Sequence, residues 1–175
     1  MDLKTDALLK GPIWADTMER LVGPIFKTYW DVYALSISIG IMHDGQIDSD
    51  SMVPEGYDAK PLAVPRNVLG HAQNKALLEF MLQTTMVTTK HLTLDESERL
   101  EIAFNQDKKL EFNPVQFLTK YANYGITKIK EVIDDTEGVE TLEGLMSFLN
   151  RTYQNGVLSI EDNEEIEDDE IIEDD

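Results

Sequence analysis

Apolar residues recur along most of the chain at spacings of three and four, the period of a helix with one buried side. After the Gly11–Pro12 pair this spacing is kept from Ile13 onwards. Proline is favoured in the first turn of a helix, because its missing N–H would have no partner there. The pattern predicts a helix from about Pro12 to Val22 that ends before Gly23–Pro24.

The segment from Thr28 to Met42 fits two patterns. Its isoleucines alternate with small polar residues from position 37 to position 41, as in a half-buried strand. Its bulky residues also fall on one side of a helix. Thr28 and Asp31 have the spacing of a capping box, with Asp in place of the usual Glu or Gln. We therefore favour a helix.

Residues 43–64 contain no periodic stretch, two prolines and two glycines. This composition predicts one long connection. Loops of that length inside compact domains are more often functional or mobile than inert.

Two helices are predicted between Pro65 and Phe104. The first opens near Asn67 and ends in a threonine-rich run after residue 82, since threonine is a poor helix former. Its expected buried side consists of Val68, Leu69, Ala72, Ala76, Leu77, Phe80, Met81 and Met86. The second starts at a capping box made by Thr93 and Glu96. Its expected buried side consists of Leu100, Ile102, Ala103 and Phe104.

Asn113 and Pro114 mark another helix start, with Asn as the cap and Pro at the first helical position. The apolar stripe then continues to Ile133. Gly125 within it costs about 1 kcal/mol relative to Ala, which indicates either close packing or a break. A last helix is predicted from about Val139 or Thr141 to Tyr153. Its expected buried residues are Leu142, Leu145, Met146, Phe148 and Leu149.

These elements predict an all-α fold: a compact bundle of about five to seven helices with one long loop and an acidic C-terminal tail. Residues 1–158 form the predicted helical domain, and residues 159–175 form the acidic tail. The segment 156–160 between the last helix and the carboxylates forms either one short strand or a docking segment.

The net charge of the chain limits the classes of function that the sequence allows. The 175 residues carry a formal charge of -19, and residues 1–160 alone hold 23 acids against 15 bases. Binding nucleic acid directly requires Lys and Arg gathered on one face, so we predict no direct nucleic-acid contact. The chain has no cysteine, and its start shows no secretory signal. The expectation is a cytoplasmic protein without a membrane segment.

The long loop holds the side chains that best fit a metal. His43, Asp44, Asp48 and Asp50 include three hard oxygen ligands for Ca²⁺ or Mg²⁺. An EF-hand counted from Asp44 fails, because Ser49 stands where that loop needs glycine. Nucleophile-elbow and glycine-rich phosphate motifs are also missing. We therefore predict no catalytic residue, no metal and no cofactor.

Eleven of the fifteen residues from 161 to 175 are Asp or Glu, and three are isoleucine. Such a segment is either a solvated tail or a ligand for something basic. As a ligand, its isoleucines would enter apolar pockets while its carboxylates meet Lys or Arg. The predicted partner-binding residues are Glu164, Glu165, Ile166, Glu167, Asp168, Asp169, Glu170, Ile171 and Ile172.

Two segments resemble a known family. "IFKTYWDVYALSISIGI" (Ile25 to Ile41) looks like a Phe-x-Thr lead-in followed by a helix with a small, glycine-containing end. "FLTKYANYGITKIKEVI" (Phe117 to Ile133) is similar to a segment with Tyr-Ala-Asn, a glycine and an amphipathic helix. The family consists of small accessory proteins encoded beside DNA phosphorothioation (Dnd) systems. The resemblance implies a protein that acts by binding partners. No catalytic residue is assigned in that family, so the resemblance implies none here.

The resulting prediction is a non-enzymatic accessory or regulatory protein that binds a DNA-modification, restriction or anti-phage defence complex. One alternative is an acidic DNA mimic that inhibits a DNA-binding or defence enzyme, because a rod of carboxylates imitates the phosphate charge of a duplex. Another is a metal-dependent enzyme that uses Asp44, Asp48, Asp50 and Glu55.

Overall fold

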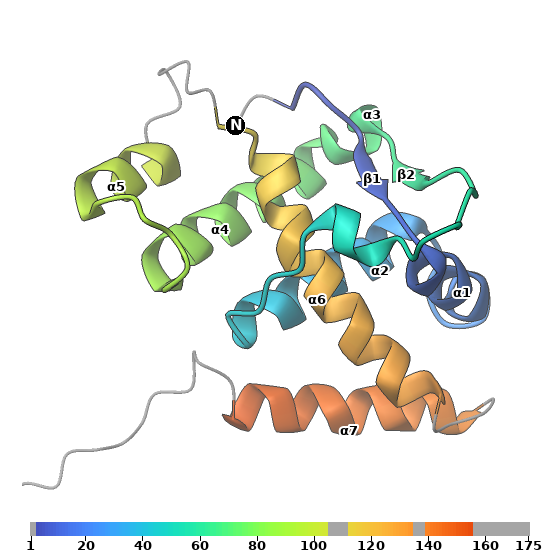
Figure 1. Cartoon of the computed structure of the whole chain (residues 1–175). Coiled ribbons are helices and arrows are strands. Elements are labelled where there is room, and N and C mark those ends of the chain that lie inside the picture. The colour runs from blue at the N-terminus through green and yellow to red at the C-terminus, as the bar shows by residue number, and fades with distance from the viewer. Residues whose placement is uncertain (1–2, 105–111, 135–138, 156–175) are drawn as a thin grey trace, which may run out of the picture.

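The structure, a computed structural model, describes residues 3–104, 112–134 and 139–155 (Figure 1). Over these ranges it contains seven α-helices, which confirms the all-α bundle. They are α1 (Pro12–Leu21), α2 (Tyr29–Met42), α3 (Arg66–Leu69), α4 (Ala72–Thr88), α5 (Glu96–Phe104), α6 (Pro114–Asp134) and α7 (Val139–Asn155).

Helices α2 and α6 cross at the centre of the bundle, and α1, α4 and α7 pack around them (Figure 1). The segment that also fitted a strand is helical. Its predicted capping box is present: the Thr28 backbone N–H donates to Asp31 Oδ2 at 2.8 Å, and the Asp31 N–H donates to Thr28 Oγ1 at 3.3 Å. Apolar residues face most directions on α2, because other elements surround it.

Two glycines let α2 and α6 approach until their backbones touch. A Cβ added to Gly40 would lie 2.2 Å from the carbonyl oxygen of Tyr121, and one added to Gly125 would lie 1.9 Å from that of Ser36. Real Cβ atoms do not come so close to backbone oxygens. The helix cost of Gly125 therefore reflects close packing and not a break, since α6 continues through it.

The start of α6 is also as predicted. The side-chain oxygen of Asn113 accepts the backbone N–H groups of Val115 and Gln116, both at 3.1 Å. Each bond satisfies a donor of the first helical turn that lacks an intrahelical partner.

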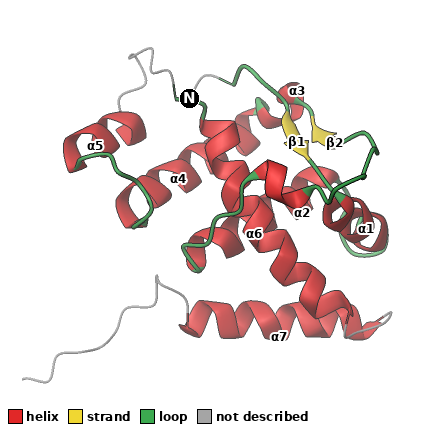
Figure 2. Cartoon of the chain, in the orientation of Figure 1, coloured by secondary structure: helices red, strands yellow, loops and turns green. Residues whose placement is uncertain are grey.

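Two short strands were not predicted. β1 (Ala7–Leu9) pairs antiparallel with β2 (Leu62–Val64) (Figure 2). In this register Ala7 faces Val64. A three-residue strand is too short to show a period of two, and its partner lies more than fifty positions away. The predicted long loop thus contains β2 and a turn of 3₁₀-helix at Ser49–Met52.

The predicted buried side of the helix after Pro65 is wrong in part. The helix is interrupted at Gly70 and His71, which separate α3 from α4. In α4 the core residues are Leu78, Met81, Leu82, Thr85 and Met86. Ala72, Ala76, Leu77 and Phe80, all expected inside, are exposed. Leu77 and Leu78 are adjacent apolar residues, so periodicity alone does not decide which side faces inwards.

The cap of α5 lies two residues after the predicted cap, Thr93, and the helix begins at Glu96. The capping box joins Asp95 and Glu98, whose backbone N–H groups donate to each other's carboxylates at 3.1 and 2.8 Å. Of the residues expected to be buried, Ala103 is buried and Ile102 is partly buried, whereas Leu100 and Phe104 are exposed.

Candidate functional site

Three of the carboxylates that were considered as metal ligands, Asp44, Asp48 and Asp50, each lie beside a different basic residue. Asp48 pairs with Lys120 at 2.7 Å, and Asp50 pairs with Lys10 at 2.9 Å. The hydrogen bond and charge of Lys10 hold the pKa of Asp50 below its usual value. Among residues 3–104, 112–134 and 139–155, no three His, Asp or Glu side chains gather as a metal site would require. These carboxylates instead fasten the loop to the domain.

Asp44 forms the centre of one such fastening. Its φ of 46° lies in the left-handed region, which Asp tolerates better than most residues. Its carboxylate is only 12% exposed and accepts the Lys90 backbone N–H at 2.9 Å. Its carbonyl oxygen lies 2.6 Å from His91 Nε2, which donates when that nitrogen carries the proton. The cluster joins the chain after α2 to the chain after α4.

Tyr121 of α6 supports this cluster from inside. Its hydroxyl donates to Thr89 Oγ1 and accepts from Gln46 Nε2, both at 2.7 Å. Burial raises the pKa of Tyr121 to about 12, so the hydroxyl stays protonated and can donate at neutral pH.

Asn123, two positions along α6, holds the other part of the loop. Its fully buried side chain accepts the indole N–H of Trp14 at 2.9 Å and donates to the Ile47 carbonyl at 3.0 Å and to Ser49 Oγ at 3.2 Å. Tyr121, Asn123 and the two glycines all belong to the segments that carry the family resemblance. In this structure these residues hold the loop and the two central helices together.

His43, the residue that caps the end of α2, contacts α6 and α7. Its ring lies 5.9 Å from the Tyr124 ring of α6 and stacks on Phe148 of α7 at 6.5 Å between centroids. Burial, and then the charge of Lys128, lower the pKa of His43. The shift favours the neutral ring, which suits its contact with two aromatic rings.

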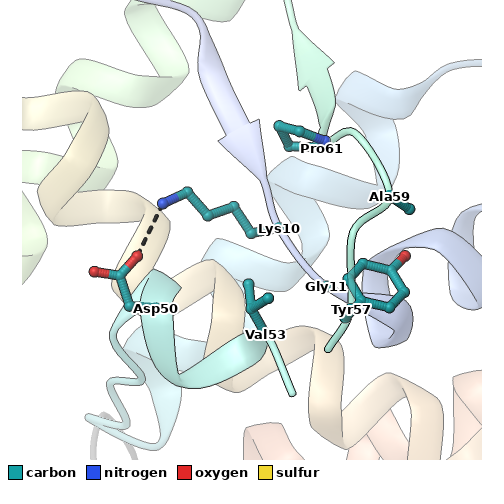
Figure 3. Close-up of a pocket in the computed structure, with 7 residues that line it drawn as sticks. All are labelled: Lys10, Gly11, Asp50, Val53, Tyr57, Ala59 and Pro61. Carbon is teal, nitrogen blue, oxygen red and sulfur yellow. Dashed lines mark hydrogen bonds and ion pairs between the residues drawn. The ribbon is translucent and has the colours of Figure 1, made fainter. Parts of the chain in front are cut away.

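A groove of about 430 Å³ lies between the segment that enters α1 and residues 53–61 (Figure 3). Lys10 and Asp50 meet at one end, while Tyr57 and Pro61 lie on the opposite wall. A Cβ on the lining residue Gly11 would overlap the carbonyl oxygen of Met52 at 1.9 Å. Because Asp50 already neutralises Lys10, the groove offers mainly apolar surface to a ligand.

Helix α7, which precedes the predicted binding segment in the sequence, presents an exposed apolar stripe. Leu142, Met146 and Tyr153 are 46%, 63% and 74% exposed, and the partly buried Leu149 lies between them in sequence. Spacings of four, three and four keep these residues on one side of a helix. The prediction that Leu142 and Met146 lie in the core is wrong, because Thr141, Leu145 and Thr152 form the buried side.

The predicted partner-binding residues, Glu164 to Ile172, lie outside the described residues. They begin nine positions after the end of α7 at Asn155. In the sequence, the first carboxylate of the block, Glu161, follows the last residue of the stripe, Tyr153, by eight positions.

Comparison with protein-family models, with curated proteins and with solved structures finds no match. The resemblance to Dnd-associated accessory proteins therefore remains a prediction from two segments. No helix in the described part of the chain is long and apolar enough to cross a membrane.

Proposed function

We propose that this protein is a non-enzymatic accessory protein that binds a partner protein through the outer stripe of α7 and the acidic tail together. The observation that carries the proposal is the exposed row of Leu142, Met146 and Tyr153, which precedes a block of eleven carboxylates in the sequence. Interfaces commonly place apolar and aromatic side chains at the centre and charge at the rim.

The partner that fits this arrangement has an apolar groove bordered by Lys and Arg. The groove receives one side of α7, as helix-in-groove complexes do, and the basic border meets the tail. Charge on the tail then accelerates encounter and selects a basic partner, while the stripe slows dissociation. The resemblance makes a DNA-modification, restriction or anti-phage defence complex the first candidate.

Affinity capture from the native cell tests the proposal. The baits are the full-length protein, a form ending at Ser159, and the variant Met146→Glu. Ser147→Glu is the matched control, because it adds the same charge at the neighbouring, exposed position of α7 away from the stripe. We expect one protein to be retained by full-length protein and by Ser147→Glu, and lost from the other two.

Two results would contradict the proposal. One is equal retention of the same proteins by all four baits. The other is nuclease, nucleotidase or transferase turnover by the pure protein, since the proposal excludes catalysis.

The DNA-mimic alternative rests on the density of carboxylates in the tail. It predicts that duplex DNA competes with the protein for the partner, and that affinity falls steeply as salt rises. Capture that persists in excess DNA favours the accessory role instead.

A further inference from the structure

Helix α5 is attached to the bundle through α4 and buries little of its own surface. It packs mainly on α4 and lies at the edge of the structure (Figure 1). Of its nine residues Ala103 alone is buried, whereas about half of the residues of α6 are buried. Leu100 and Phe104 are 45% and 58% exposed. Segments with few buried apolar side chains open at a lower cost in free energy than the core does.

Arg99 of α5 holds the end of α4. Its Nε–H donates to the Met86 carbonyl at 2.6 Å, and its Nη2 donates to the carbonyls of Val87 and Thr89 at 3.1 and 3.0 Å. These carbonyls belong to the last turn and the cap of α4, where the helix has no further N–H to offer them. The last turn of α4 has no basic residue of its own, so Arg99 also supplies the positive charge that a helix C-terminus favours.

The chain that leads from α4 to α5 is fixed to the bundle at its first residues. Thr89 is buried, and its hydroxyl oxygen accepts the hydroxyl of Tyr121 at 2.7 Å. The backbone N–H of Lys90 donates to Asp44 Oδ2 at 2.9 Å. Because neither bond involves α5, both can remain when α5 moves. Movement of α5 away from α4 therefore pivots beyond Lys90.

We propose that residues 92–104 form an arm that opens from α4 as one unit, with Arg99 as its clasp. At nine residues, α5 is shorter than the roughly 12–15 residues at which isolated helices become stable in water. The helix therefore depends on α4, and loss of that contact unfolds it as a whole. Opening frees the carbonyls that Arg99 binds and uncovers the surface of α4 that α5 covers. The arm is separate from the proposed binding surface on α7 and does not rest on the proposed function.

Native-state hydrogen exchange of the full-length chain, followed by NMR at low concentrations of denaturant, tests the arm. We expect the backbone amides from Arg99 to Phe104 to share one opening equilibrium, which makes them exchange faster than the amides of α2 and α6. Their exchange should depend only weakly on denaturant, because opening exposes little surface.

Arg99→Gln removes the clasp. Hydrogen bonds from a charged donor are strong enough that the opening equilibrium, and with it the exchange of the α5 amides, should rise about tenfold or more. Arg66→Gln is the matched control, because it removes the same charge from an exposed side chain on α3, away from α5 (Figure 1). It should leave the exchange of α5 within about twofold.

Thr28→Ala separates opening of the arm from unfolding of the whole domain. This change weakens the start of α2, which is folded whether the arm is open or closed. The slowest amides of α6, which exchange through global unfolding, should therefore exchange about fivefold faster. The amides of α5 should keep their rates, because the arm opens without α2.

Four results would overturn the proposal. The α5 amides could exchange as slowly as the slowest amides of α6, which means that they open only when the domain unfolds. They could show no protection at all, or rates that rise gradually towards the helix ends, as fraying produces. Finally, Arg99→Gln could change the exchange of α5 no more than Arg66→Gln does.

Discussion

The replacement Gly125→Ala tests the packing of α2 against α6. The added Cβ would lie 1.9 Å from the carbonyl oxygen and 2.7 Å from the carbonyl carbon of Ser36. Both atoms belong to the backbone of a central helix, so relief requires the two helices to separate by more than 1 Å. The neighbouring contact of Gly40 with Tyr121 would loosen with them.

Two opposing effects set the magnitude. Alanine favours a helix over glycine by about 1 kcal/mol. Overpacking a filled core costs about 1–3 kcal/mol, and a clash with backbone belongs at or above the upper end. The net expectation is a loss of about 2 kcal/mol or more in the free energy of unfolding, which lowers Tm by roughly 5 °C for a chain of this size.

Urea denaturation followed by circular dichroism and tryptophan fluorescence measures the loss. Ala76→Gly, at an exposed position of α4, gives the helix-propensity effect alone and should cost about 1 kcal/mol. If Gly125→Ala is as stable as the unmodified protein or more so, the gain in helix propensity exceeds the cost of the steric clash. The close crossing of α2 and α6 would then be wrong.

Three further changes probe other parts of the fold. Asn123→Ala leaves the buried indole N–H of Trp14 without its acceptor and should cost about 1–3 kcal/mol in urea denaturation; an unchanged midpoint would contradict that hydrogen bond. Thr28→Ala removes the capping box of α2 and should cost about 1 kcal/mol, whereas Thr28→Ser should retain most of the stability. For His43, burial and Lys128 lower the pKa from its ordinary value of 6.5, so the unfolded chain binds a proton more readily than the folded protein. Well above pH 6.5, the titration of His43 should thus leave the free energy of unfolding unchanged. This free energy should fall as the pH drops from 6.5 towards the lowered pKa, and level off below it. His43→Gln should remove this part of the pH profile, and an identical profile in the variant would refute the assignment.

The helices could be predicted where local chemistry determines them. Thr28 with Asp31, and Asn113 with Pro114, identify helix starts because their side chains and ring act within one turn. The cost of Gly125 pointed to close packing, although the helix that it touches could not be identified from the sequence. The loop contacts of Asn123 depend on residues more than 70 positions away, and no local pattern encodes them.

It was harder to predict which apolar residues of α4 and α7 are exposed, because each helix carries more apolar residues than one of its sides can hold. Periodicity identifies Met146 and Phe80 as apolar helix positions but does not tell whether the chain itself covers them. An excess of apolar residues around a helix was the available signal. The acidic tail, by contrast, is evident from composition alone, and its predicted partner role depends on what binds beside α7.

The central claim is that α7 and the tail act together on one partner. The most direct measurement is a titration of the purified partner, at several salt concentrations, with full-length protein, the form ending at Ser159 and Met146→Glu. The account predicts at least about tenfold weaker binding for both altered forms. It also predicts that only the shortened form loses most of its salt dependence, since Met146→Glu leaves the tail charges in place. A shortened form that keeps the full salt dependence, or a Met146→Glu variant that binds normally, would contradict it.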